Sequence, residues 1–122
     1  YYGLYGGFTG KVKWGETLQQ AALRELKEET GLAGKVSLVG IKHKMDYPAK
    51  GEILEDKFFF VFRAENLKGK LVEKFEGGRN LWLTEKEILK LPNVFDGFQE
   101  TIKMVKQKKL VFSESKYKVR GY

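Results

Sequence analysis

The pattern of hydrophobic and polar positions predicts a well-defined helix over residues 18–30. Leucine and alanine recur there at helical spacing, and strong helix formers fill the positions between them. Thr17 precedes this stretch and Gln20 follows three residues later, which is the pattern of a capping box. Gly31 then supplies a stop signal. The sequence therefore gives this helix a start, an apolar stripe and an end.

Two further helices are predicted in the second half of the chain. One begins at Thr84, has Glu87 as its capping-box partner, and ends near Pro92 because proline cannot donate a backbone hydrogen bond. The other begins after Asp96, with Gln99 in the matching position. Its apolar stripe consists of Phe98, Ile102 and Val105 and extends to Leu110.

The remaining apolar segments predict strands, so the chain belongs to the α/β class. Residues 36–41 form a β-compatible stretch. Residues 57–63 are rich in aromatic and β-branched side chains and predict a strand that is covered on both faces. Shorter strands are predicted at 70–75 and 81–83, and turns at 54–56 and 66–69.

An acidic cluster interrupts the apolar stripe of the first helix. Glu25 and Glu29 fall on the inward stripe, and Glu28 lies on its edge. The carboxylates lie at the helix C-terminus, where the helix dipole is also negative, and like charges four residues apart repel. Either divalent cations such as Mg²⁺ neutralise the cluster, or it is a solvated helix end with an Arg24–Glu28 pair.

The spacing around this cluster carries a resemblance to a known family. From Gly10 the chain gives five residues, then Glu16, then seven residues, then R-E-L-K-E-E-T-G-L over residues 24–32. This resembles the Nudix box, G-x5-E-x7-R-E-U-x-E-E-x-G-U with U aliphatic, and every defined position is filled. The length of 122 residues fits a single domain over residues 1–122. The resemblance, which covers roughly residues 5–109, implies an α/β/α sandwich with a mixed central sheet and a loop–helix–loop metal site.

The resemblance also implies an activity and residue roles. The family's enzymes are hydrolases that use Mg²⁺ or Mn²⁺ to cleave a nucleoside diphosphate linked to another group, with water attacking a phosphorus of the bridge. This chain is therefore expected to be a nucleotide pyrophosphatase, and nucleotide sanitising is one candidate role. By the resemblance, Glu28 and Glu29 are metal ligands, Glu25 is a further ligand or the general base, Glu16 and Arg24 orient the carboxylates, and the Gly10 carbonyl is an additional ligand.

Several residues outside the acidic cluster are weaker candidates. Lys11 lies near the phosphates in similar family members, although a solvated loop lysine is an equal interpretation. Glu76 is favoured over Glu73 as an extra metal-binding or base glutamate, and a charged hairpin turn is the alternative. Phe95 and Asp96 are candidates for holding the base, but Asp96 is also a natural helix N-cap, which is favoured. The other candidates are Phe8, Tyr47 and Phe58, which either stack on a base or pack in the core, and His43, which is interpreted as structural.

Composition and charge narrow the function classes. The 122 residues contain no cysteine, which excludes a disulfide scaffold and a thiolate zinc site. The net charge is +7, but residues 103–122 hold seven basic and one acidic residue, so residues 1–102 carry only +1. A solvated helix face is the favoured interpretation of this basic C-terminal segment. The alternative function is a nucleotide- or RNA-binding module without turnover, which the intact carboxylates disfavour.

The beginning of the chain departs from the family pattern. Only nine residues precede Gly10, so the strands that normally lie upstream of the box are absent from this sequence. Either the sequence is a piece of a longer chain or a second chain, for example in a homodimer, supplies them. The longest apolar run, residues 58–62, is too short to span a membrane, and no leader is seen, so a cytoplasmic protein is expected.

Overall fold

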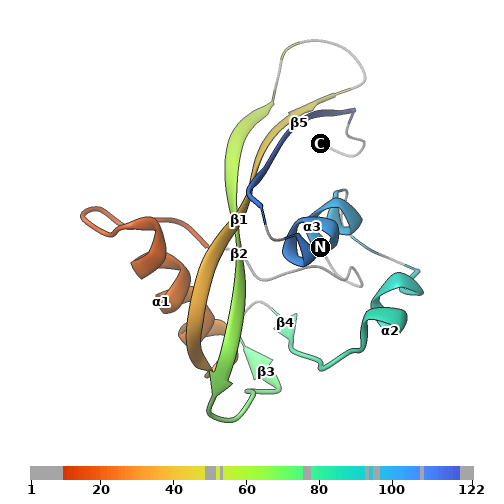
Figure 1. Cartoon of the computed structure of the whole chain (residues 1–122). Coiled ribbons are helices and arrows are strands. Elements are labelled where there is room, and N and C mark those ends of the chain that lie inside the picture. The colour runs from red at the N-terminus through yellow and green to blue at the C-terminus, as the bar shows by residue number, and fades with distance from the viewer. Residues whose placement is uncertain are drawn as a thin grey trace. The chain divides into compact units, whose positions relative to one another are not determined.

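The structure is a computed structural model. It describes residues 10–48, 52, 54–75, 78–92, 94, 97–107 and 109–118. Its elements follow one another along the chain as Figure 1 shows. They are α1 (Leu18–Thr30), β1 (Ala33–Tyr47), β2 (Glu55–Lys68), β3 (Lys74–Phe75), β4 (Gly78–Arg79), α2 (Glu85–Leu89), α3 (Phe98–Lys106) and β5 (Val111–Lys118).

Helix α1 has the bounds that the sequence predicts. The Thr17 hydroxyl accepts a hydrogen bond from the Gln20 amide at 3.1 Å, and the Gln20 side chain accepts one from the Thr17 amide at 2.9 Å. Both halves of the capping box are therefore formed. At the other end Gly31 adopts φ +76°, a left-handed conformation that favours glycine. The predicted helix is confirmed at both ends.

The two later helices also form, within a residue or two of their predicted starts. Thr84 caps α2 in a second capping box with Glu87, with contacts of 2.9 and 3.2 Å. Helix α2 ends at Leu89, ahead of Pro92. Helix α3 begins at Phe98 and ends at Lys106, so Leu110 lies beyond it. The buried residue of α3 is Met104, which the predicted apolar stripe does not include.

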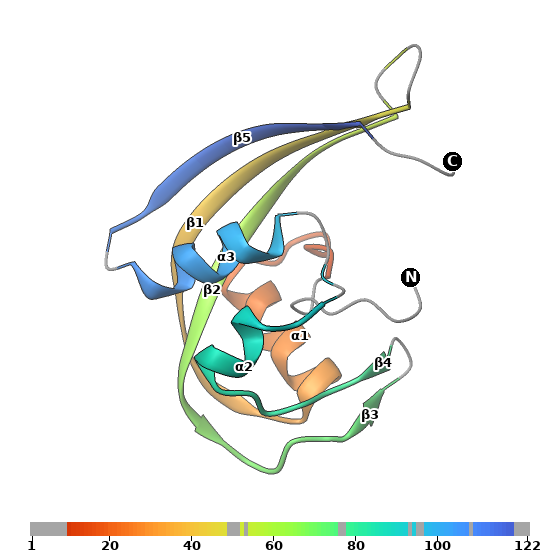
Figure 2. The same cartoon turned by 90° about the vertical axis from the view of Figure 1, so that its right-hand side faces the viewer.

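The main sheet has the strand order β2-β1-β5 (Figure 2). β5 runs parallel to β1, in a register from Gly40↔Val111 to Tyr47↔Lys118. β2 follows β1 after a connection of only residues 48–54, which is too short for the crossover that parallel strands require. The sheet is therefore mixed, and with its helices it confirms the α/β class.

Strand β5 corrects the interpretation of the basic C-terminal segment. The sequence favours a solvated helix face for residues 103–122, but among the residues of this segment that the structure describes, 103–106 belong to a helix and Val111–Lys118 form a strand. The reason is that the pairing partner of β5 is β1, a segment far earlier in the chain. A lysine-rich stretch does not signal such a partner.

Strand β2 departs from the prediction in length and in burial. It runs through both predicted turns, since it starts at Glu55 and ends at Lys68. Phe58 is 56% exposed and Phe60 is 41% exposed, so the prediction of cover on both faces is wrong. Within the described residues β2 lies at one end of the sheet order, where one side has no neighbouring strand. The predicted strand at 81–83 is also absent, and β3 and β4 instead form a short antiparallel pair.

The chain divides into two compact units, one with residues 1–37 and 64–99 and the other with residues 38–63 and 100–122. Among the described residues of the first unit, the buried apolar residues come from α1, from the connection to β1 and from the start of β1, and they are Ala21, Leu26, Leu32 and Val36. In the second unit Val39 and Met104 are buried. A Cβ atom at Gly40 would lie 2.5 Å from the Met104 sulfur, so the glycine makes room for this side chain. Among the described residues, no helix has the length and apolar composition that crossing a membrane requires.

Candidate active site

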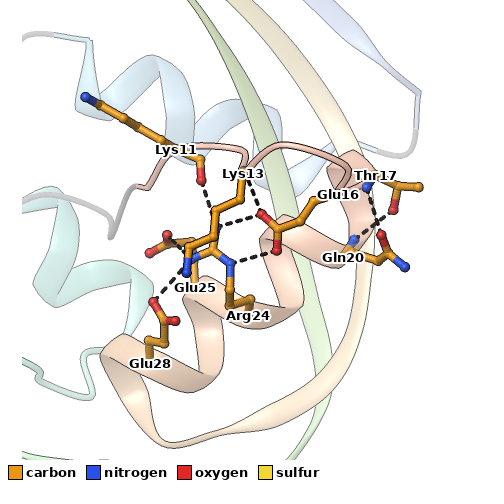
Figure 3. Close-up of polar contacts among 8 residues, drawn as sticks. All are labelled: Lys11, Lys13, Glu16, Thr17, Gln20, Arg24, Glu25 and Glu28. Carbon is orange, nitrogen blue, oxygen red and sulfur yellow. Dashed lines mark hydrogen bonds and ion pairs between the residues drawn. The ribbon is translucent and has the colours of Figure 1, made fainter.

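The guanidinium group of Arg24 connects the loop before α1 to the helix itself. Its Nε donates to Glu16 Oε2 at 2.7 Å, and its Nη2 donates to Glu16 Oε1 at 2.9 Å (Figure 3). This is a bidentate ion pair, which fixes the orientation of the two side chains as well as the distance between them. Both side chains are 18% exposed. The two residues that the sequence assigned to orientation are thus in direct contact.

The same guanidinium group also contacts two carboxylates of the acidic cluster. Arg24 Nη1 donates to Glu25 Oε1 at 2.6 Å and to Glu28 Oε2 at 3.2 Å. Nη2 makes a further contact of 2.7 Å with the Lys11 carbonyl. All three guanidinium nitrogens are therefore used, and Figure 3 shows their partners around a single side chain. Lysine could not make this set of contacts, because it lacks the planar fork.

Glu16 has a second anchor in its own loop. The Lys13 amide donates to Glu16 Oε1 at 2.7 Å, and the Glu16 amide donates to the Lys13 carbonyl at 3.0 Å. The hydrogen bond from Arg24 and then that from Lys13 lower the pKa of Glu16 to about 2. Conversely, Glu16 and Glu25 raise the pKa of Arg24. Glu16 is therefore ionised throughout the neutral range.

Gly10 lies directly against the carboxylate of Glu25. A Cβ atom at position 10 would overlap the carboxylate group of that glutamate. The first glycine of the box therefore allows the backbone to approach the acidic cluster closely. No other residue type fits this position unless Glu25 moves.

Glu29 differs from its two neighbours in the acidic cluster. Its side chain is partly buried, and no described group donates a hydrogen bond to Oε2. Burial raises the pKa of Glu29, and the negative charges of Glu25 and Glu28 raise it further. A buried carboxylate oxygen without a donor is costly unless a cation or a proton compensates it.

The donor set of the acidic cluster fits a hard divalent cation in its chemistry. Glu25, Glu28 and Glu29 offer only oxygen atoms, and Glu29 has one that is without a donor. Across the described ranges, however, no three His, Cys, Asp or Glu side chains are gathered as a complete metal site. Glu25 and Glu28 instead contact Arg24. Among the described side chains, the carboxylates of Glu25, Glu28 and Glu29 are the candidates for holding a metal ion.

The other predicted site residues either make no side-chain contact with the acidic cluster that the structure describes, or lie outside the described residues. Lys11 is exposed and contributes its carbonyl to Arg24, while its amine points away from the acidic cluster (Figure 3). Glu76, Phe95 and Asp96 lie outside the described residues, as does Phe8. Of the remaining candidates, Phe58 stacks on His43 with ring centroids 4.4 Å apart, and His43 Nε2 lies 2.5 Å from Asp56 Oδ1.

One residue near the acidic cluster was not predicted from the sequence. The Asn80 side-chain amide donates to the Glu29 carbonyl at 2.6 Å and to the Val72 carbonyl at 2.9 Å. Asn80 follows β4, and asparagine is common near turns for other reasons. No spacing rule in the sequence links it to the end of α1, so only the structure brings it to the site.

Comparison with known proteins agrees with this fold and with the box. The NUDIX domain family model matches residues 2–105. The crystal structure of the mutator MutT protein from Bacillus halodurans superposes with a TM-score of 0.79 at 25% sequence identity, covering 89% of this chain and 71% of that chain. The chain therefore belongs to the NUDIX domain family. The hydrolases of this family generally use divalent metal ions.

Two relatives of known activity match part of the chain. An oxidized purine nucleoside triphosphate hydrolase from Danio rerio is 39% identical over 75 residues, which are 61% of this chain and 46% of the relative. An ADP-ribose pyrophosphatase from Methanocaldococcus jannaschii is 43% identical over 58 residues, which are 47% of this chain and 32% of the relative. The chain thus spans less than half the length of either relative.

Proposed function

We propose that this chain catalyses the divalent-metal-dependent hydrolysis of a nucleoside diphosphate-linked substrate, with water attacking a phosphorus of the diphosphate bridge. The observation that carries the proposal is the arrangement around Arg24, which fixes Glu16, Glu25 and the loop carbonyl of Lys11 in one group of contacts. Such rigid positioning beside a cluster of carboxylates is what metal-assisted phosphoryl chemistry requires.

The cation, Mg²⁺ or Mn²⁺, would be held by Glu28 and Glu29, with the Gly10 carbonyl as a further ligand. When bound, the cation polarises phosphoryl oxygens and lowers the pKa of coordinated water. The Glu29 oxygen without a donor supports this assignment, because a cation would compensate it. Glu76 would add a carboxylate from the connection between β3 and β4.

The chain's own residues supply orientation and proton transfer. Arg24, fixed by Glu16, holds Glu25 Oε1 at 2.6 Å and so limits where this carboxylate can point. Glu25 would accept a proton from the attacking water, since a general base must lie within hydrogen-bond reach of its proton. Lys11 would stabilise the charge of the leaving phosphate, and Phe95 and Asp96 would hold the base.

The relatives' names support the substrate class. A purine nucleoside triphosphate and ADP-ribose share one chemical unit, a nucleoside joined to a diphosphate. Hydrolysis of that unit is therefore the activity proposed for this chain. Nucleotide sanitising is one form of it, because the Danio rerio relative is named for oxidized purine substrates.

The test is the Glu29→Gln variant in a phosphate-release screen with Mg²⁺ or Mn²⁺ over nucleoside triphosphates, dinucleoside polyphosphates and nucleotide sugars. We expect kcat to fall by about 100-fold or more, because the cation would lose a charged ligand. Because burial raises the pKa of Glu29, its ionised form disfavours the fold, and the neutral variant should melt at the same or a higher temperature.

The matched control is Glu52→Gln, which changes an exposed glutamate in the connection between β1 and β2 and should leave kcat unchanged. A wild-type protein that cleaves none of the substrates with either metal would contradict the proposed function. Binding of single-stranded RNA with a steep salt dependence, again without hydrolysis, would instead support the alternative of a binding module.

A further inference from the structure

The carbonyl groups at the end of α1 need partners from outside the helix. The last four carbonyls of any α-helix have no intrahelical donor. In α1, the Lys27 carbonyl accepts from the Gly31 amide at 2.9 Å, which leaves those of Glu28, Glu29 and Thr30 for partners outside the helix. Because helix ends fray, a side chain on this last turn is positioned only as well as its backbone is held. Glu29 lies on that turn.

The segment from Val72 to Asn80 supplies donors to two of these carbonyls. The Val72 amide donates to the Thr30 carbonyl at 2.8 Å. The Asn80 side chain donates to the Glu29 carbonyl at 2.6 Å. The same segment packs closely, since a Cβ atom on Gly31 would lie 2.8 Å from a methyl carbon of Val72. The end of α1 is therefore held by a segment that is distant in sequence.

Asn80 uses every donor it has in this arrangement. Its side-chain amide donates to the carbonyls of Glu29 and Val72, and its backbone amide donates to the Glu73 carbonyl at 2.8 Å. Asparagine has two side-chain N–H groups in one plane, whereas aspartate has none when ionised and serine has one. Asn80 therefore joins the end of α1 to both sides of the segment that contains β3 and β4.

We propose that Asn80 is a positioning residue for the metal-binding carboxylate of Glu29. The inference rests on the proposed function, because it needs Glu29 to be a ligand. By holding the Glu29 carbonyl, Asn80 fixes the last turn of α1 so that the partly buried carboxylate keeps its place. Groups that orient ligands in this way typically contribute 10–100-fold to metal affinity.

The experiment measures Mn²⁺ binding directly, by electron paramagnetic resonance of the free ion, in the whole chain. In Asn80→Ala and Asn80→Asp we expect affinity for Mn²⁺ to fall by about tenfold. With metal at saturation, kcat should fall while the KM for nucleotide changes less than about twofold. The aspartate variant keeps the shape of the side chain but removes both donors, so it separates hydrogen bonding from packing.

Thr84→Ala is the matched control. It removes the N-cap of α2, which costs a comparable amount of stability without a described contact to α1, and it should leave Mn²⁺ affinity unchanged. Amide hydrogen exchange over residues 26–31 adds a metal-free measurement. Exchange over these residues should become faster in both Asn80 variants. In Thr84→Ala it should be as slow as in the wild type.

The outcomes separate this inference from the proposed function. If the wild type binds Mn²⁺ and the Asn80 variants bind it equally well, the positioning role is wrong while the proposed function stands. Equal weakening in Thr84→Ala would also overturn it, because the effect would then follow general stability. A wild type that binds no Mn²⁺ would contradict the proposed function and, with it, the role given to Asn80.

Discussion

The loop–helix segment of residues 10–31 and strand β5 differ in how far apart in sequence their contacting residues are. In the loop–helix segment the deciding contacts join residues close in sequence, such as Thr17 with Gln20 and Arg24 with Glu16, eight positions apart. In β5 every ladder contact reaches to β1, far earlier in the chain. These deciding contacts of the first segment are polar, and the residues that make them can be recognised from their spacing. The second depends on a partner that its own residues do not specify.

The difference also lies in how each region is stabilised. Around Arg24 the contacts are hydrogen bonds and ion pairs between partly exposed groups, each of which contributes little to net stability. In the unit that contains β5, Met104 of α3 is 2% exposed and packs against Gly40 of β1. We therefore expect the largest losses of stability in the packed region and the largest losses of activity in the polar one.

The largest expected effect on stability comes from Met104→Ala. Truncating a buried methionine removes apolar contacts and leaves a cavity, which costs about 2–5 kcal/mol. Urea denaturation should show this loss in the free energy of unfolding. Helix α3 should then detach from β1 more readily, whereas the contacts around Arg24 should persist in the folded fraction.

A double-mutant cycle with Gly40→Ala sharpens this prediction. Gly40→Ala alone should destabilise by about 1–3 kcal/mol, because its Cβ would overlap the Met104 sulfur. In the double variant the new methyl group occupies space that Met104 has vacated. The double variant should therefore lose less stability than the sum of the losses in the two single variants. Strict additivity would show that the two residues do not pack as described.

A smaller effect is expected from Thr17→Ala at the start of α1. The variant loses the hydroxyl that accepts from the Gln20 amide, which costs about 1 kcal/mol. Thermal melting should show a modest decrease, and Thr17→Ser, which keeps the acceptor, should restore most of it. A loss as large as that of Met104→Ala would contradict the view that the polar region contributes less to stability.

The smallest effect is a pH dependence from Glu16. Its folded-state pKa of about 2 lies below the ordinary value of 4.5, so its ionised form favours the folded state at pH values above 4.5. This contribution is lost as the pH falls toward 2. The difference in unfolding free energy between wild type and Glu16→Gln should therefore be smaller at about pH 3 than at neutral pH. A difference that is independent of pH would contradict the described contacts of Glu16.

The sequence predicted the parts of the site that depend on local spacing. The capping box, the Gly31 stop and the placement of Glu25, Glu28 and Glu29 on one helix all follow from a helical repeat. The α/β class and the α2 capping box were likewise predicted. The assigned roles of the carboxylates stay predictions until metal binding is measured.

The burial of β2 and the role of β5 could not be predicted in the same way. Phe58 and Phe60 lie in a strongly apolar run, yet they are exposed because cover depends on neighbouring segments and not on the strand itself. The lysines of residues 103–122 suggested a solvated face, while pairing with β1 makes Val111–Lys118 a strand. Strand pairing depends on contacts between distant segments, and the entropic cost of bringing them together cannot be read from a local sequence pattern.

By itself, the sequence determined the loop–helix segment, its cluster of carboxylates and the membership of a family, because each follows from residue types at fixed short spacing. Only the tertiary structure decided that Arg24 uses all three guanidinium nitrogens, that Glu29 keeps an oxygen without a donor, and that Asn80 holds the end of α1. The physical reason is that hydrogen-bond partners and burial are properties of segments brought together in space.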